Sequence, residues 1–204
     1  MNGGRITGSD VSRVSITIGV IVAVIALGVI GYFVFFAHVV KEQMTGFDPN
    51  RPVPDDATLR KRLTPEQYRV VREKGTETAF KNKLWDNFRP GIYVDVITRE
   101  PLFSSADKFD GQTGRPTFSK PISPDAIVTR DDNSYDMHRI EAVAKRSNAH
   151  LGHLIQDPSS PTGQRYAVNS AALYFIPVDE MDQAGYGAYK QYATAAASPQ
   201  PAHK

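Results

Sequence analysis

An uncharged run over residues 14–40 is the feature that most constrains this chain. It lies between Arg13 and Lys41, and it exceeds the roughly 20 apolar residues with which a helix crosses a bilayer. The run has no polar face, which argues against a helix packed in a soluble core. A cleaved signal peptide has a shorter apolar segment, about 7–15 residues, and ends in a small-residue cleavage site. We therefore predict a short N-terminal tail, residues 1–13, and an uncleaved transmembrane helix, residues 14–40.

The basic residues that flank this run indicate its orientation. Arg5 and Arg13 precede it, and Lys41 and the more distant Arg51 follow it. Because cytoplasmic flanks carry the excess of Lys and Arg, the N-terminus is expected in the cytoplasm. The rest of the chain is then expected on the outer, periplasmic or extracytoplasmic face, with the lipid bilayer as one partner.

Charge and cysteine content exclude several function classes. The formal net charge is only +2, and the chain has no cysteine. No basic face for nucleic acid is implied, so no nucleic-acid partner is expected. The absence of cysteine excludes disulfides, thiolate metal sites and a thiol nucleophile.

Three regions follow the apolar run. Residues 41–62 contain Pro49, Pro52 and Pro54 among polar turn formers, so we predict a stalk. Residues 63–178 are expected to form one folded domain. The remaining residues, 179–204, are rich in Ala, Gln, Gly and Pro and are predicted to be a mostly disordered tail.

The domain begins with a helix signal and continues with strand signals. Thr64 can cap a helix, Pro65 suits the first helical position, and Gln67 completes a capping box, so we predict a helix that ends at Lys74. Short β-branched or alternating segments, separated by loops rich in Gly, Pro and Ser, predict a mainly β, antiparallel domain. The expected strands are 91–97, 126–129, 139–144 and 171–176.

Seven short stretches occur in a distinctive order between residues 63 and 177. They read LTPEQY (63–68), GTE (75–77), GIYV (91–94), PLFSS (101–105), KFD (108–110), AHLGH (149–153) and RYAVNS (165–170). In this order and spacing they resemble the B-type methionine sulfoxide reductase family, which reduces the R epimer of methionine sulfoxide in proteins. The resemblance implies a small twisted antiparallel β-barrel-like fold with peripheral helices.

The resemblance places Ala167 where the family carries its nucleophile. That residue is a cysteine, or sometimes a selenocysteine, and thioredoxin usually regenerates it. A thiolate attacks the sulfoxide sulfur and becomes a sulfenic acid, which a methyl group cannot do. In the family motif Gly-x-Gly-Trp-Pro-Ser-Phe, the tryptophan that holds the substrate methyl group is Arg115 here, and Phe118 keeps the phenylalanine of this substrate-binding motif.

The polar half of the family site is retained. The matching positions, which orient water and protonate the sulfoxide oxygen in the family, are His150, His153, Asp157, Arg165 and Asn169. Three alternatives stay open. The histidines could satisfy hydrogen bonds around a vestigial pocket, Asp157 and Arg165 could form a structural ion pair, and Arg115 could lie on the surface or recognise an anion.

No metal and no other cofactor is expected. Many family members hold zinc with two Cys-x-x-Cys pairs, and the matching positions here are Asp95 with Thr98 and Ala144 with Ser147. A zinc-free branch of the family also lacks these cysteines, so their absence says nothing about activity. The two histidines of AHLGH have no further ligand at a fitting spacing.

Two functional hypotheses follow. The first is a membrane-anchored, catalytically inactive domain that serves as a binding or structural subunit. Its partners would be a membrane or envelope protein complex, or a methionine-containing peptide. The alternative is a peptide-methionine (R)-S-oxide reductase in which an alteration has replaced the nucleophilic cysteine with Ala167.

Overall fold

A computed structural model describes residues 25–32 and 46–194, which belong to two separate units, 1–44 and 45–204. Residues 25–32 form a helix. Across the described residues, no helix combines the length and apolar character that a membrane span needs. The predicted tail 1–13 and most of the predicted span 14–40 fall outside the described residues, so the span stays a prediction.

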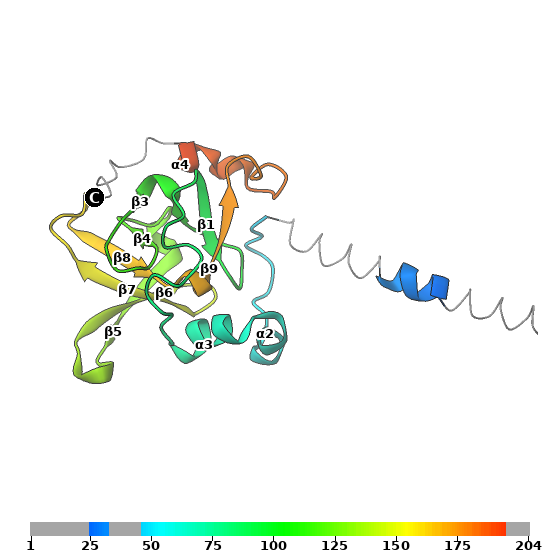
Figure 1. Cartoon of the computed structure of the whole chain (residues 1–204), viewed down its shortest axis with the longest axis horizontal. Coiled ribbons are helices and arrows are strands. Elements are labelled where there is room, and N and C mark those ends of the chain that lie inside the picture. Colours follow the sequence, from blue (N-terminus) through cyan, green and yellow to red (C-terminus); the bar gives the residue numbers. More distant parts are fainter. Residues whose placement is uncertain (1–24, 33–45, 195–204) are drawn as a thin grey trace, which may run out of the picture. The chain divides into compact units, whose positions relative to one another are not determined.

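Two antiparallel sheets form the second unit and confirm the mainly β prediction (Figure 1). The small sheet has the order β2-β1-β9, with β1 (Gly91–Asp95), β2 (Pro101–Ser104) and β9 (Leu173–Pro177). The large sheet has the order β3-β4-β8-β7-β6-β5. Its strands are β3 (Lys108–Phe109), β4 (Thr117–Phe118), β5 (Ile127–Asp132), β6 (Arg139–Ala144), β7 (Ala149–Gln156) and β8 (Gln164–Val168).

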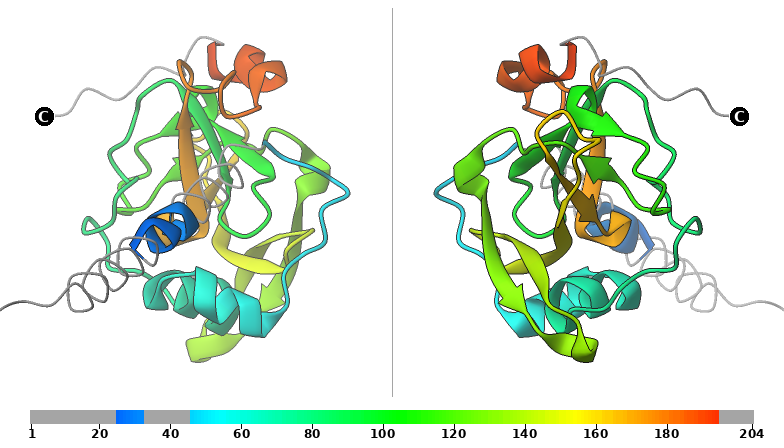
Figure 2. Two further views of the ribbon diagram at one scale, coloured as in Figure 1. Left: turned by 90° about the vertical axis from the view of Figure 1, so that its right-hand side faces the viewer. Right: turned by 90° about the vertical axis from the view of Figure 1, so that its left-hand side faces the viewer.

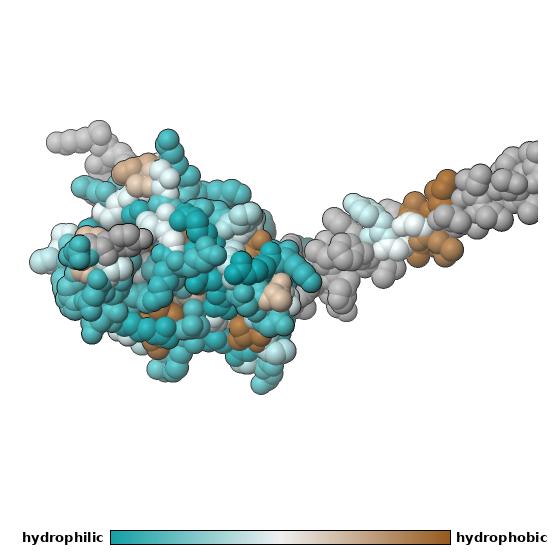
Figure 3. Space-filling model, turned by 90° about the horizontal axis from the view of Figure 1, so that it is seen from below, coloured by the Kyte–Doolittle hydropathy of each residue, from teal (hydrophilic) through white to brown (hydrophobic). Residues whose placement is uncertain are grey.

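Short connections and helices complete the unit. Helices α2 (Asp56–Arg62) and α3 (Pro65–Glu73) lie at one end of the sheets and α4 (Lys190–Thr194) at the other (Figures 1 and 2). The surface seen in Figure 3 is mostly hydrophilic over this unit. The 3-10 turns are η1 (Ser105–Asp107), η2 (Pro124–Ala126), η3 (Ser134–Asp136), η4 (Ser170–Ala172) and η5 (Gly187–Tyr189).

Four aromatic side chains, which we call the aromatic joint, connect the two sheets. Tyr93 and Phe103 come from the small sheet, and Phe118 and Tyr166 come from the large sheet. The rings of Phe103 and Phe118 stack with centroids 4.4 Å apart, and Tyr93 meets Phe118 edge-on at 4.9 Å. Such contacts add about 0.5–1.5 kcal/mol per pair to simple burial. Phe118, predicted to bind substrate, is thus fully buried in the core.

The region predicted as a stalk is partly folded. Asp55 caps α2 by accepting a hydrogen bond of 2.8 Å from the Thr58 amide, and Leu59 is buried. Residues 55–62 therefore belong to the folded unit, which corrects the predicted stalk of 41–62. The capping box of α3 is present as predicted, but the helix ends at Glu73 because Lys74 takes a left-handed conformation.

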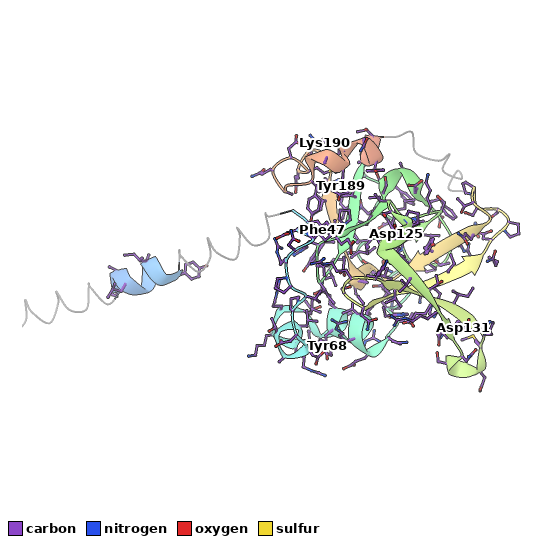
Figure 4. The ribbon with its side chains drawn as sticks, turned by 180° about the vertical axis from the view of Figure 1, so that it is seen from behind. Phe47, Tyr68, Asp125, Asp131, Tyr189 and Lys190 are labelled. Atoms are coloured by element: carbon purple, nitrogen blue, oxygen red, sulfur yellow. The ribbon has the colours of Figure 1, made fainter. Side chains whose placement is uncertain are left out.

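The predicted disordered tail is also partly wrong. Residues 178–194 fold over the small sheet, where Met181 and Tyr186 are buried against Ile92 and Val94 of β1. Their apolar side chains are too widely spaced to give a periodic pattern, so the sequence did not reveal this packing. Phe47 and Tyr189, labelled in Figure 4, pack against the same residues. We call this group the second core cluster; residues 195–204 are outside the described residues.

The second core cluster leads to a stability prediction. Replacing Met181, which is 0% exposed, with Ala should lower the free energy of unfolding by about 3 kcal/mol, because it leaves a cavity in a packed core. Met137 is 47% exposed, and Met137→Ala should change it by less than about 0.5 kcal/mol. Urea unfolding of the full chain in detergent micelles measures both. Equal effects would show that residues 178–194 add nothing to the core.

Candidate functional site

Position 167 lies in the middle of the large sheet. Ala167 of β8 is directly opposite His153 of β7 and Thr117 of β4. Side chains at directly opposed positions share one face of a sheet, so the Ala167 methyl group is flanked by a histidine and a threonine. The two strands approach closely here, because a Cβ atom at Gly152 would lie 2.1 Å from the Ala167 carbonyl oxygen.

A β-bulge brings His150 and His153 together. Residues three apart on a regular strand point to opposite faces of the sheet. Between the paired positions Ala142–Gly152 and Val143–His150, however, β7 contains one extra residue, Leu151. This extra residue turns the two imidazole rings to within 5.5 Å of each other, centroid to centroid.

His150 belongs to a buried polar cluster. Its Nδ1 lies 2.8 Å from Glu141 Oε1, and Lys74 Nζ donates to the other carboxylate oxygen at 2.8 Å. Burial would raise the pKa of Glu141, but the hydrogen bonds from Lys74 and His150 outweigh it and lower the pKa. Burial also lowers the pKa of His150. A neutral His150 that donates from Nδ1 leaves Nε2 as an acceptor, and this atom is buried without a hydrogen-bond partner.

His153 is held by a second carboxylate. Its Nε2 lies 2.7 Å from Asp132 Oδ2, which also receives a bond of 2.8 Å from Arg139. The other oxygen, Oδ1, accepts from the hydroxyl and the amide of Ser134. The hydrogen bond from the Ser134 hydroxyl is the largest cause that holds the pKa of Asp132 well below its usual range, and the hydrogen bond with His153 is the second. Asp132 therefore fixes the orientation of the His153 ring.

Arg115 is positioned by the loop between β3 and β4. Its backbone amide donates to Thr113 Oγ1 at 3.3 Å, and its carbonyl accepts from Thr117 Oγ1 at 3.1 Å. The guanidinium Nη2 donates to the backbone carbonyl of Glu77 at 3.1 Å. Arg115 is half-buried. The interpretation of Arg115 as a surface residue is therefore not supported by its position.

Asn169 and Glu77 form hydrogen bonds that connect the backbone segments around position 167. The Asn169 amide oxygen accepts from the Glu77 backbone amide at 3.2 Å, and its Nδ2 donates to the Leu151 carbonyl at 3.1 Å. Both carboxylate oxygens of Glu77 accept from backbone amides at the start of η4. Both polar atoms of the Asn169 side chain thus form hydrogen bonds to the backbone.

Asp157 and Arg165 form the ion pair considered as one alternative from the sequence. Arg165 Nη1 lies 3.1 Å from Asp157 Oδ2 and donates to the Gly111 carbonyl at 3.0 Å. Asp157 Oδ1 accepts from the hydroxyl and amide of Ser159. These bonds hold the loop between β7 and β8 to the segment that precedes β4.

A cavity of about 560 Å³ opens beside Ala167. Of the predicted site residues, it brings together Ala167, Arg115, His153 and Asn169, whereas His150, Asp157, Arg165 and Phe118 do not line it. His150 lines a separate cavity of about 80 Å³ with Glu141. The remaining lining residues of the large cavity are Thr76, Thr113, His138, Arg139, Ile140, Gly152, Leu154, Ile155 and Gln156.

Sequence reasoning missed three carboxylates that organise this site: Glu77, Asp132 and Glu141. Glu77 lies in one of the seven stretches but was given no role. Glu141 lies in an alternating segment whose pattern indicates a strand without indicating the partner of its acidic side chain. Asp132 follows the predicted strand 126–129, and no local pattern there indicates that its carboxylate contacts a histidine on another strand.

The positions that match zinc cysteines hold ordinary turn contacts. Asp95 Oδ2 accepts a hydrogen bond of 2.6 Å from the Thr98 hydroxyl, and Ser147 Oγ accepts from the Ala149 amide at 3.2 Å. Within the part of the chain that the structure describes, no group of three or more metal-ligating side chains is close enough to hold a metal ion.

Comparison with known proteins agrees with the architecture. A model of the SelR domain matches residues 63–177, more than half of the chain. The chain is also 49% identical, over 136 residues, to a protein of Vibrio cholerae serotype O1 named peptide methionine sulfoxide reductase MsrA/MsrB. The matched region is 67% of this chain and 36% of that relative, so the chain spans about a third of its length.

The Asp132 cluster predicts a pH-dependent stability difference. Asp132→Asn should lower the free energy of unfolding at pH 7 by about 2 kcal/mol, because it weakens charge-assisted hydrogen bonds to His153 and Arg139. The folded-state pKa of Asp132 lies below its ordinary value of 3.8, so its ionised form stabilises the fold above that pH. The difference between wild type and variant should then shrink between about pH 4 and pH 2.

Urea unfolding across this pH range measures the difference. The matched control is Asp131→Asn, because Asp131 is an exposed neighbour in the β5–β6 hairpin (Figure 4). A difference for Asp132→Asn that stays constant down to pH 2 would contradict the assigned role of its charge.

Proposed function

We infer the function of this chain from one premise: it belongs to the SelR domain family, whose model matches residues 63–177. From that premise we propose a catalytically inactive family member that is anchored to a membrane by residues 14–40. In this proposal the domain acts as a binding or structural subunit on the outer face of the membrane. Its partners would be a membrane or envelope protein complex, or a methionine-containing peptide.

The observation that carries this proposal is Ala167 in the wall of the 560 Å³ cavity, in a chain without any cysteine. Reduction of a sulfoxide needs a soft nucleophile that can take up the oxygen as a sulfenic acid. A methyl group has no lone pair and cannot form a bond to sulfur. Hydroxyl and imidazole groups do not replace a thiolate in this redox step.

The substitution at Arg115 supports the same proposal independently. In the family this position carries a tryptophan against which the methyl group of the substrate packs. Arg115 replaces this tryptophan with a cation beside the cavity. The aliphatic part of the arginine side chain covers less apolar surface than an indole ring. The side-chain amide of Asn169 bonds to the Leu151 carbonyl, and His153 bonds to Asp132. These contacts suit a site whose polar groups stabilise the fold.

A second candidate function is a reductase whose nucleophilic cysteine has been replaced by Ala167. The 49% identity to a protein named as a peptide methionine sulfoxide reductase favours it. In this case the rest of the cavity should still accept methionine sulfoxide. The two candidates differ in what happens when the cysteine is restored.

Restoring the family residues tests both candidates. The unaltered chain should show no turnover of a methionine-R-sulfoxide peptide with a dithiol reductant, because it lacks a nucleophile. Ala167→Cys alone should give little turnover, and Ala167→Cys with Arg115→Trp should exceed it at least about 10-fold, since an apolar platform is worth roughly 1.4 kcal/mol or more. Ala167→Ser with Arg115→Trp is the matched control without a thiol.

Three outcomes are decisive. Turnover by the unaltered chain above that of a heat-inactivated sample would overturn the inactive assignment. Full turnover by Ala167→Cys alone would favour the second candidate, because Arg115 would then be compatible with the substrate. Sequencing the source gene at codon 167 provides a separate check, since an alanine codon there rules out a later alteration.

The membrane anchor has its own test. The full chain should remain in the membrane pellet after extraction with alkaline carbonate, whereas a variant that lacks residues 14–40 should be released, because it loses more than the roughly 20 apolar residues of a span. Protease added to cells that have an opened outer envelope and an intact cytoplasmic membrane should digest the folded unit. Release of the full chain by carbonate would contradict the anchor.

A further inference from the structure

We propose that the cavity beside Ala167 binds a carboxylate group carried by a peptide, with Arg115 as the residue that recognises it. The inference rests on the proposed function, since it assigns a ligand to the cavity that a non-reducing member of the family retains. The carboxylate could come from a glutamate side chain or from a peptide C-terminus, which present the same planar anion.

Charge is distributed asymmetrically around this cavity. Its lining includes two arginines and two histidines, Arg115, Arg139, His138 and His153, and no aspartate or glutamate. Asp132, which is not among the lining residues, already compensates Arg139 and contacts His153. Arg115 is different, because it forms no ion pair within the described residues.

The guanidinium of Arg115 is incompletely hydrogen-bonded. Nη2 donates to the Glu77 carbonyl, and the buried Nε has no hydrogen-bond partner. The charge of Arg115 acts on the nearby Glu77 carboxylate and opposes the rise in the Glu77 pKa on burial, but the two groups form no ion pair, and both Glu77 oxygens accept from the amides of Ser170 and Ala171. A half-buried cation with unused donors costs free energy, which an incoming anion would recover.

A carboxylate fits this cation better than other groups. The guanidinium is planar and can present two parallel N–H donors to a carboxylate. The lining also includes three apolar residues, Ile140, Leu154 and Ile155, so the cavity offers apolar contacts to an aliphatic stem. A volume of about 560 Å³ is within the range of small-ligand pockets and can hold one side chain with its adjoining backbone.

The proposal is tested with three peptides of otherwise equal sequence. Each is titrated into the full chain in neutral detergent micelles, and calorimetry measures its binding affinity. The first has an internal glutamate and blocked termini. The second has glutamine at that position and a free C-terminal carboxylate. The third has glutamine and blocked termini, and is neutral. At least one carboxylate peptide should bind about 10-fold or more tightly than the neutral peptide, and which one does so identifies the source of the carboxylate.

Variants then identify the recognising residue. Arg115→Gln should weaken the binding of that carboxylate peptide by about 10-fold to 100-fold, the expected range for a charge-assisted hydrogen bond. Arg60→Gln is the matched control, because the Arg60 side chain is 60% exposed in α2, and it should leave the affinity unchanged. If Arg115→Gln does not fold, the Nε–H signal of Arg115 in the unaltered, arginine-labelled chain provides the readout, and it should shift on binding.

The proposal is overturned if the neutral peptide binds as tightly as both charged ones, if no peptide binds, or if neither the Arg115→Gln affinity nor the Arg115 signal changes. None of these outcomes would affect the inactive assignment, which depends on turnover. Conversely, turnover by the unaltered chain would overturn the proposed function without altering the measured preference for a carboxylate.

Discussion

The stacking of Phe103 on Phe118 is the contact on which the rest of the folded unit depends. Each ring belongs to a different sheet, and the two centroids are 4.4 Å apart. The strand that carries Phe118 also pairs with β8, where Phe118 is opposite Tyr166 and the preceding Thr117 is opposite Ala167. The alternation of side chains along β4 therefore places the aromatic joint on one face and position 167 on the other. The packing of the core thus fixes the location of the cavity.

Around position 167, most polar side chains form hydrogen bonds or ion pairs with neighbouring protein groups. Glu141 holds His150, Asp132 holds His153, and Asn169 bonds to backbone on both sides. Such mutual satisfaction is what a buried polar network requires. The matching is incomplete, because His150 Nε2 and the Nε atoms of Arg115 and Arg165 are buried without a hydrogen-bond partner. Arg165 is paired with Asp157, whereas Arg115 forms no ion pair within the described residues, so the site combines a hydrogen-bonded polar framework with a cation that has no paired carboxylate.

Local patterns in the sequence predicted the parts of the fold that have strong local signals. The β-branched segment of β1 and the capping box of α3 were both found where expected. Helix α2 was missed because three prolines precede it, and the packing of Met181 and Tyr186 was missed because their spacing follows no period. Of the residues that the resemblance places in the site, Ala167, Arg115, His153 and Asn169 line the cavity. The pairing of His150 with Glu141 depends on a bulge at Leu151. An extra residue in a strand leaves no mark in the composition, so only the three-dimensional register reveals it.

The second core cluster also has a mechanical consequence. Phe47, near the start of the folded unit, and Ala193, near the end of its described part, both pack against this cluster. Arg146 adds a clamp, because it bonds to the Arg51 carbonyl and its guanidinium lies 5.6 Å from the centre of the Phe47 ring. Both ends of the described part of the folded unit are thus packed against the small sheet, and the N-terminal end is also bonded to the β6–β7 turn of the large sheet. A pulling force applied near Phe47 would therefore be shared between the two sheets, whereas one applied near Ala193 would act first on the small sheet.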